Sequence, residues 1–140
     1  MSGEALLHVD GVVGGYGATQ VLHGLSLQVR AGCATALLGG NGAGKTTLMK
    51  TLAGLLPVRE GRIRFLGEDI TARPANERVL AGLVLVPEGR MVFPSLTVHE
   101  NLRLGAINPR ARPQWQRTLE HVYHVFPRLK ERESQLAVTL

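Results

Sequence analysis

Two kinds of apolar run occur along the chain, and they predict two kinds of β-strand. Residues 25–29 (LSLQV) and 62–65 (RIRF) alternate apolar and polar side chains, a pattern typical of sheets with one face in water. Residues 34–38 (ATALL) and 83–86 (LVLV) contain almost no polar side chain, which favours strands covered on both faces. The pattern therefore predicts a small antiparallel layer built around a parallel α/β core.

Helices are predicted between these runs by apolar spacing and by glycine and proline at their ends. Residues 45–53 place two leucines one turn apart, and Gly54 supplies the stop. Pro74 is placed to open a short helix that Gly82 closes. The sequence therefore predicts one helix directly after the first apolar run and a second directly before residues 83–86.

Two further helices are predicted in the last third of the chain. Thr97 is followed three residues later by Glu100, the spacing of a capping box, and this predicts a helix through about Leu104. Residues 113–126 predict a last helix that ends at Pro127. One face of this helix carries four apolar side chains: Trp115, Leu119, Val122 and Phe126.

Composition and charge narrow the class of protein. A chain of 140 residues with 44% hydrophobic and 19% charged residues is typical of one globular domain. The net charge of +5 is spread along the chain without a block of consecutive Lys or Arg, so we expect a solvated surface and no nucleic-acid partner. The uncharged run at residues 31–44 is too short and glycine-rich to span a bilayer. Cys33 is the only cysteine, which agrees with a reducing compartment.

A phosphate-binding loop is predicted at residues 39–46 (GGNGAGKT), which match G-x-x-x-x-G-K-[ST] between an apolar run and a helix. Four glycines let successive backbone N–H groups form an anion nest, and the helix N-terminus adds partial positive charge. Lys45 would reach the β- and γ-phosphates, the Thr46 hydroxyl would ligate Mg²⁺, and Thr47 would add a hydroxyl donor. The predicted nucleoside-triphosphate site comprises Gly39, Gly40, Asn41, Gly42, Ala43, Gly44, Lys45, Thr46 and Thr47.

The carboxylate that follows residues 83–86 raises the question of a catalytic base. An apolar strand that ends on a carboxylate is where a nucleotide hydrolase often keeps a metal ligand or base. Here Pro87 interrupts the junction, and no aspartate precedes Glu88. Both features argue against Glu88 as the catalytic base.

Three stretches together resemble the ATP-binding subunit of ABC transporters, and the resemblance covers nearly the whole chain. They are GYGATQVLHGLSLQV (15–29), NGAGKTTLMKTLAGLLPVREGRI (41–63) and VPEGRMVFPSLTVHENL (86–102). The last of them, followed by VYHVFPRLKER (122–132), looks most like the F-type (LivF-like) subunit of high-affinity branched-chain amino-acid importers.

The resemblance implies roles for residues outside the phosphate loop. Tyr16 occupies the position where an aromatic ring stacks on adenine, an interaction of roughly 1–3 kcal/mol. Glu88 occupies the Q-loop position, where it would ligate Mg²⁺ together with Thr46 and act as a nucleotide sensor and coupling residue. The expected cofactors are ATP and Mg²⁺, and no catalytic residue is expected in this chain.

The resemblance also implies a fold and its division into parts. We expect an α/β fold with an ABC-type P-loop NTPase core, an antiparallel β layer and the start of a helical subdomain. Residues 1–93 would form the nucleotide-binding core with the β layer, and residues 94–140 the start of the helical subdomain. In the family, the stretch SQLAVTL (134–140) leads into the signature motif. We therefore expect a C-terminally truncated domain without the signature, the Walker B strand or the switch histidine, and hydrolysis by it alone is uncertain.

The expected function is that of an ATP-binding subunit, which couples ATP binding and hydrolysis to uptake of branched-chain amino acids. The expected partners are transmembrane permease subunits, a second ATP-binding subunit in a homo- or heterodimer, and indirectly a periplasmic or extracellular solute-binding protein. Such a subunit would be cytoplasmic and peripheral on the inner face of the plasma membrane. Two alternatives stay open: a non-hydrolysing nucleotide-binding remnant, and the ATPase subunit of an ABC transporter for another solute. His121 and His124 are expected to be helix-surface residues.

Overall fold

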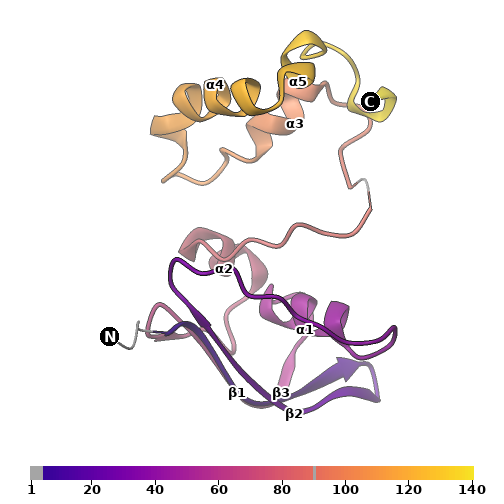
Figure 1. The fold of residues 1–140 in the computed structure, drawn as a ribbon, viewed down its shortest axis with the longest axis vertical. Helices are drawn as coiled ribbons and strands as arrows, with labels where there is room; N and C mark the ends of the chain where they lie inside the picture. Colours follow the sequence, from indigo (N-terminus) through magenta and orange to yellow (C-terminus); the bar gives the residue numbers. More distant parts are fainter. Residues whose placement is uncertain (1–4, 90) are drawn as a thin grey trace. The chain divides into compact units, whose positions relative to one another are not determined.

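The computed structural model describes residues 5–89 and 91–140 and shows a mixed α/β chain, as the sequence predicts (Figure 1). The chain divides into two units, of which the first ends at Leu85 and the second begins at Val86. The domain boundary expected at residues 93–94 stays a prediction. The first unit contains β1 (Ala5–Tyr16), β2 (Thr19–Arg30), α1 (Lys45–Leu52), β3 (Val58–Phe65), β4 (Glu68–Asp69) and α2 (Ala75–Ala81). The second contains α3 (Val98–Leu104), α4 (Trp115–Val125), α5 (Pro127–Glu131) and the 3₁₀ turns η1 (Arg112–Gln114) and η2 (Ala137–Thr139).

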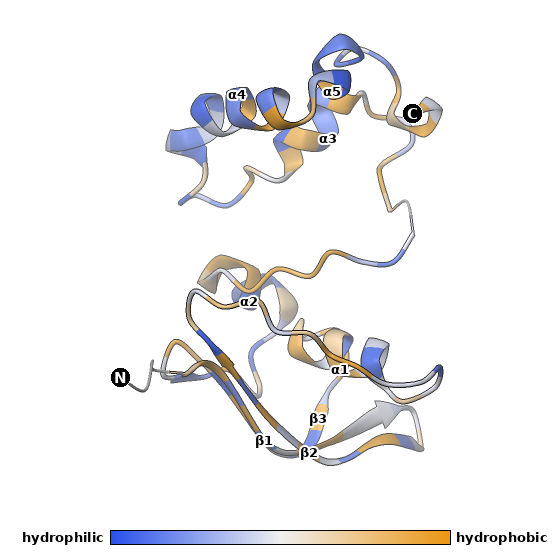
Figure 2. Cartoon of the chain, viewed as in Figure 1, coloured by the Kyte–Doolittle hydropathy of each residue, from blue (hydrophilic) through white to orange (hydrophobic). Residues whose placement is uncertain are grey.

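The four strands form one antiparallel sheet in the order β2-β1-β3-β4. Both segments with alternating polarity lie in it, residues 25–29 in β2 and residues 62–65 in β3. Val9 pairs with Ile63 and is fully buried, whereas Asp10 next to it is exposed opposite Arg62. Figure 2 shows hydrophilic and hydrophobic positions along the same strands. The predicted antiparallel layer with one face in water is confirmed.

The hydrophobic core of the first unit lies between this sheet and α1. Leu48 and Leu52, the two leucines that predict this helix, are 1% and 8% exposed. Burying a leucine contributes roughly 1.5–3 kcal/mol, so this face of α1 fixes the helix, and with it the loop that precedes the helix. The buried core residues are Leu7, Val9, Val12, Leu22, Leu48, Leu52, Ile63, Phe65 and Ile70.

The parallel core predicted from residues 34–38 and 83–86 does not form among the described residues. Neither segment is a strand, and no strand ladder in the described part of the chain includes either of them. Leu38 is 89% exposed and Val84 is 67% exposed. A strand needs a neighbour to accept its backbone hydrogen bonds, and the described residues supply none for these segments. The apolar pattern indicates a preference for burial, and the prediction of strands at residues 34–38 and 83–86 is wrong for the described part of the chain.

The second unit begins with an irregular segment and continues with the predicted helices. Thr97 caps α3, because its hydroxyl accepts from the Glu100 backbone N–H at 3.2 Å while the Glu100 carboxylate accepts from the Thr97 N–H at 2.8 Å. The capping box is confirmed. On α4, Leu119 is buried, whereas Phe126 lies at the junction with α5 and is 57% exposed. The predicted single helix through Phe126 is therefore interrupted one residue earlier.

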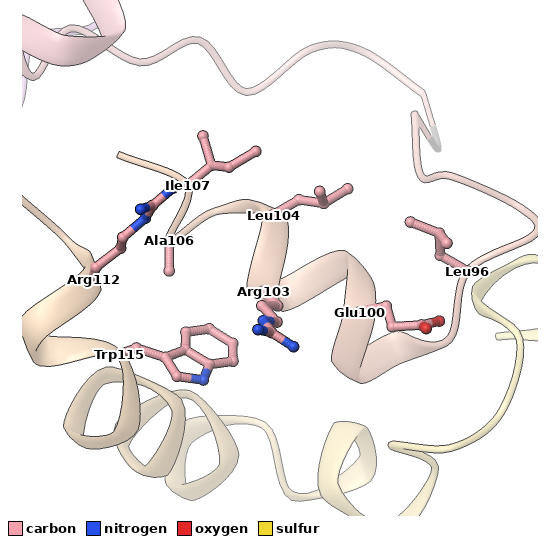
Figure 3. A pocket seen from close by; sticks show the side chains of 8 residues that line it. All are labelled: Leu96, Glu100, Arg103, Leu104, Ala106, Ile107, Arg112 and Trp115. Carbon is pink, nitrogen blue, oxygen red and sulfur yellow. The ribbon is translucent and has the colours of Figure 1, made fainter. Parts of the chain in front are cut away.

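An open groove lies between α3 and the beginning of α4 (Figure 3). Its volume is about 730 Å³. At its α4 end, the rings of His99 and Trp115 pack edge to face with centroids 5.8 Å apart. The residues that line it are Leu96, Glu100, Arg103, Leu104, Ala106, Ile107, Arg112 and Trp115. No helix in the described part of the chain is long and apolar enough to cross a membrane.

Candidate functional site

The phosphate-loop segment turns into α1 through glycines with left-handed backbone. Gly42 has φ of 82° and Gly44, the residue before the helix, has φ of 87°. The Gly44 carbonyl accepts the first helical hydrogen bond, from the Leu48 N–H at 2.8 Å. Gly39 and Gly40 lie outside the left-handed region, and a Cβ on Gly40 would meet nothing within 4 Å. Two of the four glycines are therefore required by the local backbone.

Lys45 reaches back across the loop and binds its carbonyls. The Nζ atom donates to the Gly39 oxygen at 2.6 Å and to the Gly40 oxygen at 2.7 Å. No acidic residue lies in the first turn of α1, so no carboxylate in that turn offsets the partial positive charge of the helix N-terminus. The loop thus combines an ammonium group, a helix N-terminus and left-handed glycines, an arrangement that fits a bound polyphosphate.

The two threonines that follow Lys45 differ in accessibility. Thr46 is exposed, whereas Thr47 is only 5% exposed. The Thr47 carbonyl accepts a hydrogen bond from the Thr51 hydroxyl at 2.8 Å. Of the two residues, Thr46 is therefore the more accessible to solvent. Its ligation of Mg²⁺ and the phosphate contact of Thr47 stay predictions.

Tyr16 ends β1 at a tight turn into β2, and its side chain is 43% exposed. The same hairpin packs against the phosphate loop, because a Cβ on Gly44 would lie 3.2 Å from the Val21 Cγ1 atom and 3.4 Å from the Leu22 Cδ2 atom. The structure therefore brings the predicted adenine platform and the predicted phosphate site into one unit. The stacking role of Tyr16 stays a prediction.

Glu88 lies in the second unit, in an irregular exposed segment and not at the end of a strand. Its role as Q-loop sensor and its pairing with Thr46 at Mg²⁺ therefore stay predictions. Among residues 5–89 and 91–140, no group of three or more His, Cys, Asp or Glu side chains could hold a metal ion. His121 and His124 are exposed on α4, as expected of helix-surface residues.

Arg78 is a buried residue at the far end of α1 that the sequence did not indicate. It is 2% exposed, and its NH1 atom donates to the carbonyls of Thr51 at 2.9 Å and Leu52 at 2.8 Å, at the C-terminus of α1. Its other nitrogens donate to the carbonyls of Arg73 at 2.8 Å and Thr71 at 2.9 Å. Burial lowers the pKa of this guanidinium from its ordinary value, and the four carbonyls compensate for its lost hydration. Arg78 therefore caps the helix that carries the phosphate loop.

Two further cations contact the hairpin that carries Tyr16, and the sequence did not indicate them either. The Lys50 Nζ atom lies 5.6 Å from the centroid of the Tyr16 ring. The Arg59 guanidinium donates to the carbonyl of Gly17, in the turn, and to that of Thr19, directly after it. Neither contact has a local sequence signal, because the partners are far apart along the chain.

Comparison with known proteins identifies the family. The model of the ABC transporter family matches residues 22–138. The chain is 41% identical over 135 residues to the high-affinity branched-chain amino acid transport ATP-binding protein BraG of Pseudomonas aeruginosa, covering 96% of this chain and 58% of BraG. It is 39% identical over 104 residues to the xylose import ATP-binding protein XylG of Burkholderia cenocepacia, covering 73% of this chain and 20% of XylG. The chain thus spans little more than half the length of BraG.

The structure gives the same result. It matches the crystal structure of a nucleotide-free ATP-binding cassette from an ABC transporter with a TM-score of 0.80 and 27% identity. That match covers 98% of this chain and 59% of the cassette. A second match, to an ATP-binding subunit of an ABC transporter, has a TM-score of 0.78 and 32% identity over 94% of this chain and 54% of the subunit.

Proposed function

Since this chain belongs to the ABC transporter family, we propose that it is the ATP-binding part of a transport-coupled ATPase. The observation that carries the proposal is the position of Lys45, whose ammonium group bridges the Gly39 and Gly40 carbonyls directly before α1. A positive group held in a loop at an uncompensated helix N-terminus fits the phosphates of a nucleoside triphosphate. The 41% identity to a transport ATP-binding protein supports the same function.

Each residue of the proposed site would contribute one kind of contact. The backbone N–H groups of residues 39–44 and the Lys45 ammonium would hold the phosphates, and Tyr16 would stack on adenine. The exposed Thr46 hydroxyl would ligate Mg²⁺, which would offset the charge of the phosphates when bound. Glu88 would act as a sensor and coupling residue. With no catalytic base assigned within this chain, hydrolysis is proposed for the assembled transporter.

We further propose uptake of branched-chain amino acids as the process that this subunit drives. The support is the similarity to BraG, a branched-chain amino acid transport ATP-binding protein, which covers 96% of this chain. Relatives such as XylG are named for xylose import and match 73% of this chain, so xylose is the alternative solute. The proposed partners are membrane-spanning permease subunits and a second ATP-binding subunit, which place this chain at the cytoplasmic face of the membrane.

Nucleotide binding is tested directly with the variant Lys45→Met. Removing the ammonium deletes a charge-assisted contact of roughly 1.5–3 kcal/mol, so we expect MgATP affinity, measured by titration calorimetry on the full chain, to fall at least about tenfold. Lys130→Met is the matched control, because it removes an exposed lysine on α5 of the second unit. Equal ATP affinity in the two variants would refute the proposed site.

The solute is tested by uptake in the cell that makes the protein. We expect Lys45→Met in the chromosomal copy to lower the initial rate of leucine uptake and to leave xylose uptake unchanged. The reverse pattern would support the sugar. Normal uptake of both solutes, in a variant that no longer binds ATP, would refute both solutes and favour the two alternatives, a non-hydrolysing remnant or a transporter for another solute.

A further inference from the structure

One face of the Tyr16 ring is approached by a cation from the phosphate-loop helix. The Lys50 Nζ atom lies over this ring, 5.6 Å from its centroid, within the range at which an ammonium is attracted to an aromatic face. Lys50 is on α1, one turn after Thr46. The same helix therefore carries the phosphate-binding end and a group that contacts the predicted adenine platform.

The turn that carries this ring is itself anchored. Arg59, on β3, donates to the carbonyl of Gly17 in the turn and to that of Thr19 directly after it. The turn is tight, because a Cβ on Gly15 would lie 2.1 Å from the Thr19 oxygen. The backbone of the hairpin is thus held by Arg59, and the orientation of the ring is left to side-chain contacts.

We propose that Lys50 is a positioning residue for adenine, because it holds the Tyr16 ring by one face and leaves the opposite face for the base. This inference rests on the proposed nucleotide site and adds a residue to it. An ammonium that stays over the ring restricts rotation of the side chain, so the stacking surface is set before the nucleotide arrives. The gain in affinity therefore comes from binding of the base and does not depend on the phosphates.

The test compares ATP with inorganic triphosphate, which lacks the base. We expect Lys50→Met to lower the affinity for MgATP about two- to fivefold beyond any change for Mg-triphosphate, the range of an exposed cation–π contact. Lys50→Arg should keep the wild-type ratio of the two affinities, because a guanidinium also packs on an aromatic face. In the Tyr16→Leu background, Lys50→Met should leave the ratio unchanged.

Titration calorimetry on the full chain supplies both affinities, and far-UV circular dichroism confirms that each variant keeps the helical content of the parent. Lys50→Gln replaces Lys50→Met if the latter unfolds. An equal loss for ATP and triphosphate would overturn the inference, since it would show that the charge of Lys50 acts on phosphate. The inference would also be overturned if Lys50→Met left the ratio of MgATP to Mg-triphosphate affinity unchanged, or if it changed this ratio equally in the wild-type and Tyr16→Leu backgrounds. These results leave the proposed nucleotide site intact, whereas failure of Lys45→Met to weaken either ligand would remove that site.

Discussion

Lys45 and Arg78 place positive charge at opposite ends of α1. The helix dipole favours this charge at the C-terminus and disfavours it at the N-terminus. At the C-terminus, the Arg78 guanidinium meets carbonyls that the helix leaves unpaired, which is favourable for a cation. At the N-terminus, the Lys45 ammonium adds to a partial positive charge and donates to the Gly39 and Gly40 carbonyls. An arriving polyphosphate relieves this excess, so the residues at the two ends together favour an anion at the loop.

The glycines of the loop should differ in what a methyl group does to the fold. Gly44→Ala combines a φ of 87° with a Cβ 3.2 Å from Val21, so we expect it to lower the free energy of unfolding by about 1–3 kcal/mol. Gly40→Ala has open space and no left-handed backbone, and should change it by less than about 0.5 kcal/mol. Urea unfolding followed by circular dichroism measures both. Equal decreases in the free energy of unfolding would show that the backbone requires glycine no more at position 44 than at position 40.

At the scale of the elements, the sequence predicts helix ends correctly where the determining residues lie within a few positions of one another. Pro74 and Gly82 bound α2, and Thr97 with Glu100 begins α3. Each of these caps involves residues within about one helical turn, so residue type and spacing suffice to predict it. The pairing of residues 34–38 and 83–86 depends on neighbours elsewhere, and no ladder forms for them in the described chain.

The residues of the candidate site also fall into two groups, those with a local sequence signal and those that depend on distant contacts. The glycine-rich loop and its helix follow from a local motif, and α1 begins at Lys45 as predicted, whereas phosphate binding by the loop stays a prediction. Lys50, Arg59 and Arg78 act on residues far away in the sequence. Their contacts exist only because the sheet and α1 bring distant segments together. No spacing rule could have identified them, and a basic residue in the sequence is most often a solvated one.

The capping box of α3 should make the second unit sensitive to acid. Hydrogen bonds from the Thr97 backbone and side chain lower the pKa of Glu100 below its ordinary value of 4.5. A carboxylate whose pKa is lowered by folding stabilises the fold above its unfolded pKa, and this contribution is lost as the pH falls through the folded pKa. We expect Glu100→Gln to lower the urea midpoint of the second unit at pH 7, because the charge at the helix N-terminus is lost.

The wild type and Glu100→Gln should converge as the pH falls from 4.5 through the lower pKa of the folded state, because the wild-type carboxyl then becomes neutral as well. The midpoints can be followed through the single tryptophan, Trp115, which is in this unit. Glu120→Gln, at an exposed position on α4, serves as the control. A difference between wild type and Glu100→Gln that persists unchanged into acid would contradict the argument.

At the scale of the whole molecule, the described chain keeps much apolar surface in contact with water. The apolar runs at residues 34–38 and 83–86, which the sequence marks for burial, include Leu38 at 89% and Val84 at 67% exposure. Scattered exposed apolar residues are ordinary, but unpaired apolar segments that expose backbone groups promote association. We therefore expect the chain to self-associate through the surface of the first unit, to an extent that rises with protein concentration.

A matched pair of leucines tests this expectation. Leu38 lies in an unpaired apolar run, whereas Leu55, 58% exposed, lies in the turn after α1. Because burying a leucine contributes roughly 1.5–3 kcal/mol, we expect Leu38→Gln to weaken self-association of the full chain by about tenfold or more in sedimentation velocity. Leu55→Gln should change it little, and neither variant should lower the urea midpoint, since both side chains are exposed. Equal association constants for Leu38→Gln and the wild type would show that the run at 34–38 takes no part in self-association.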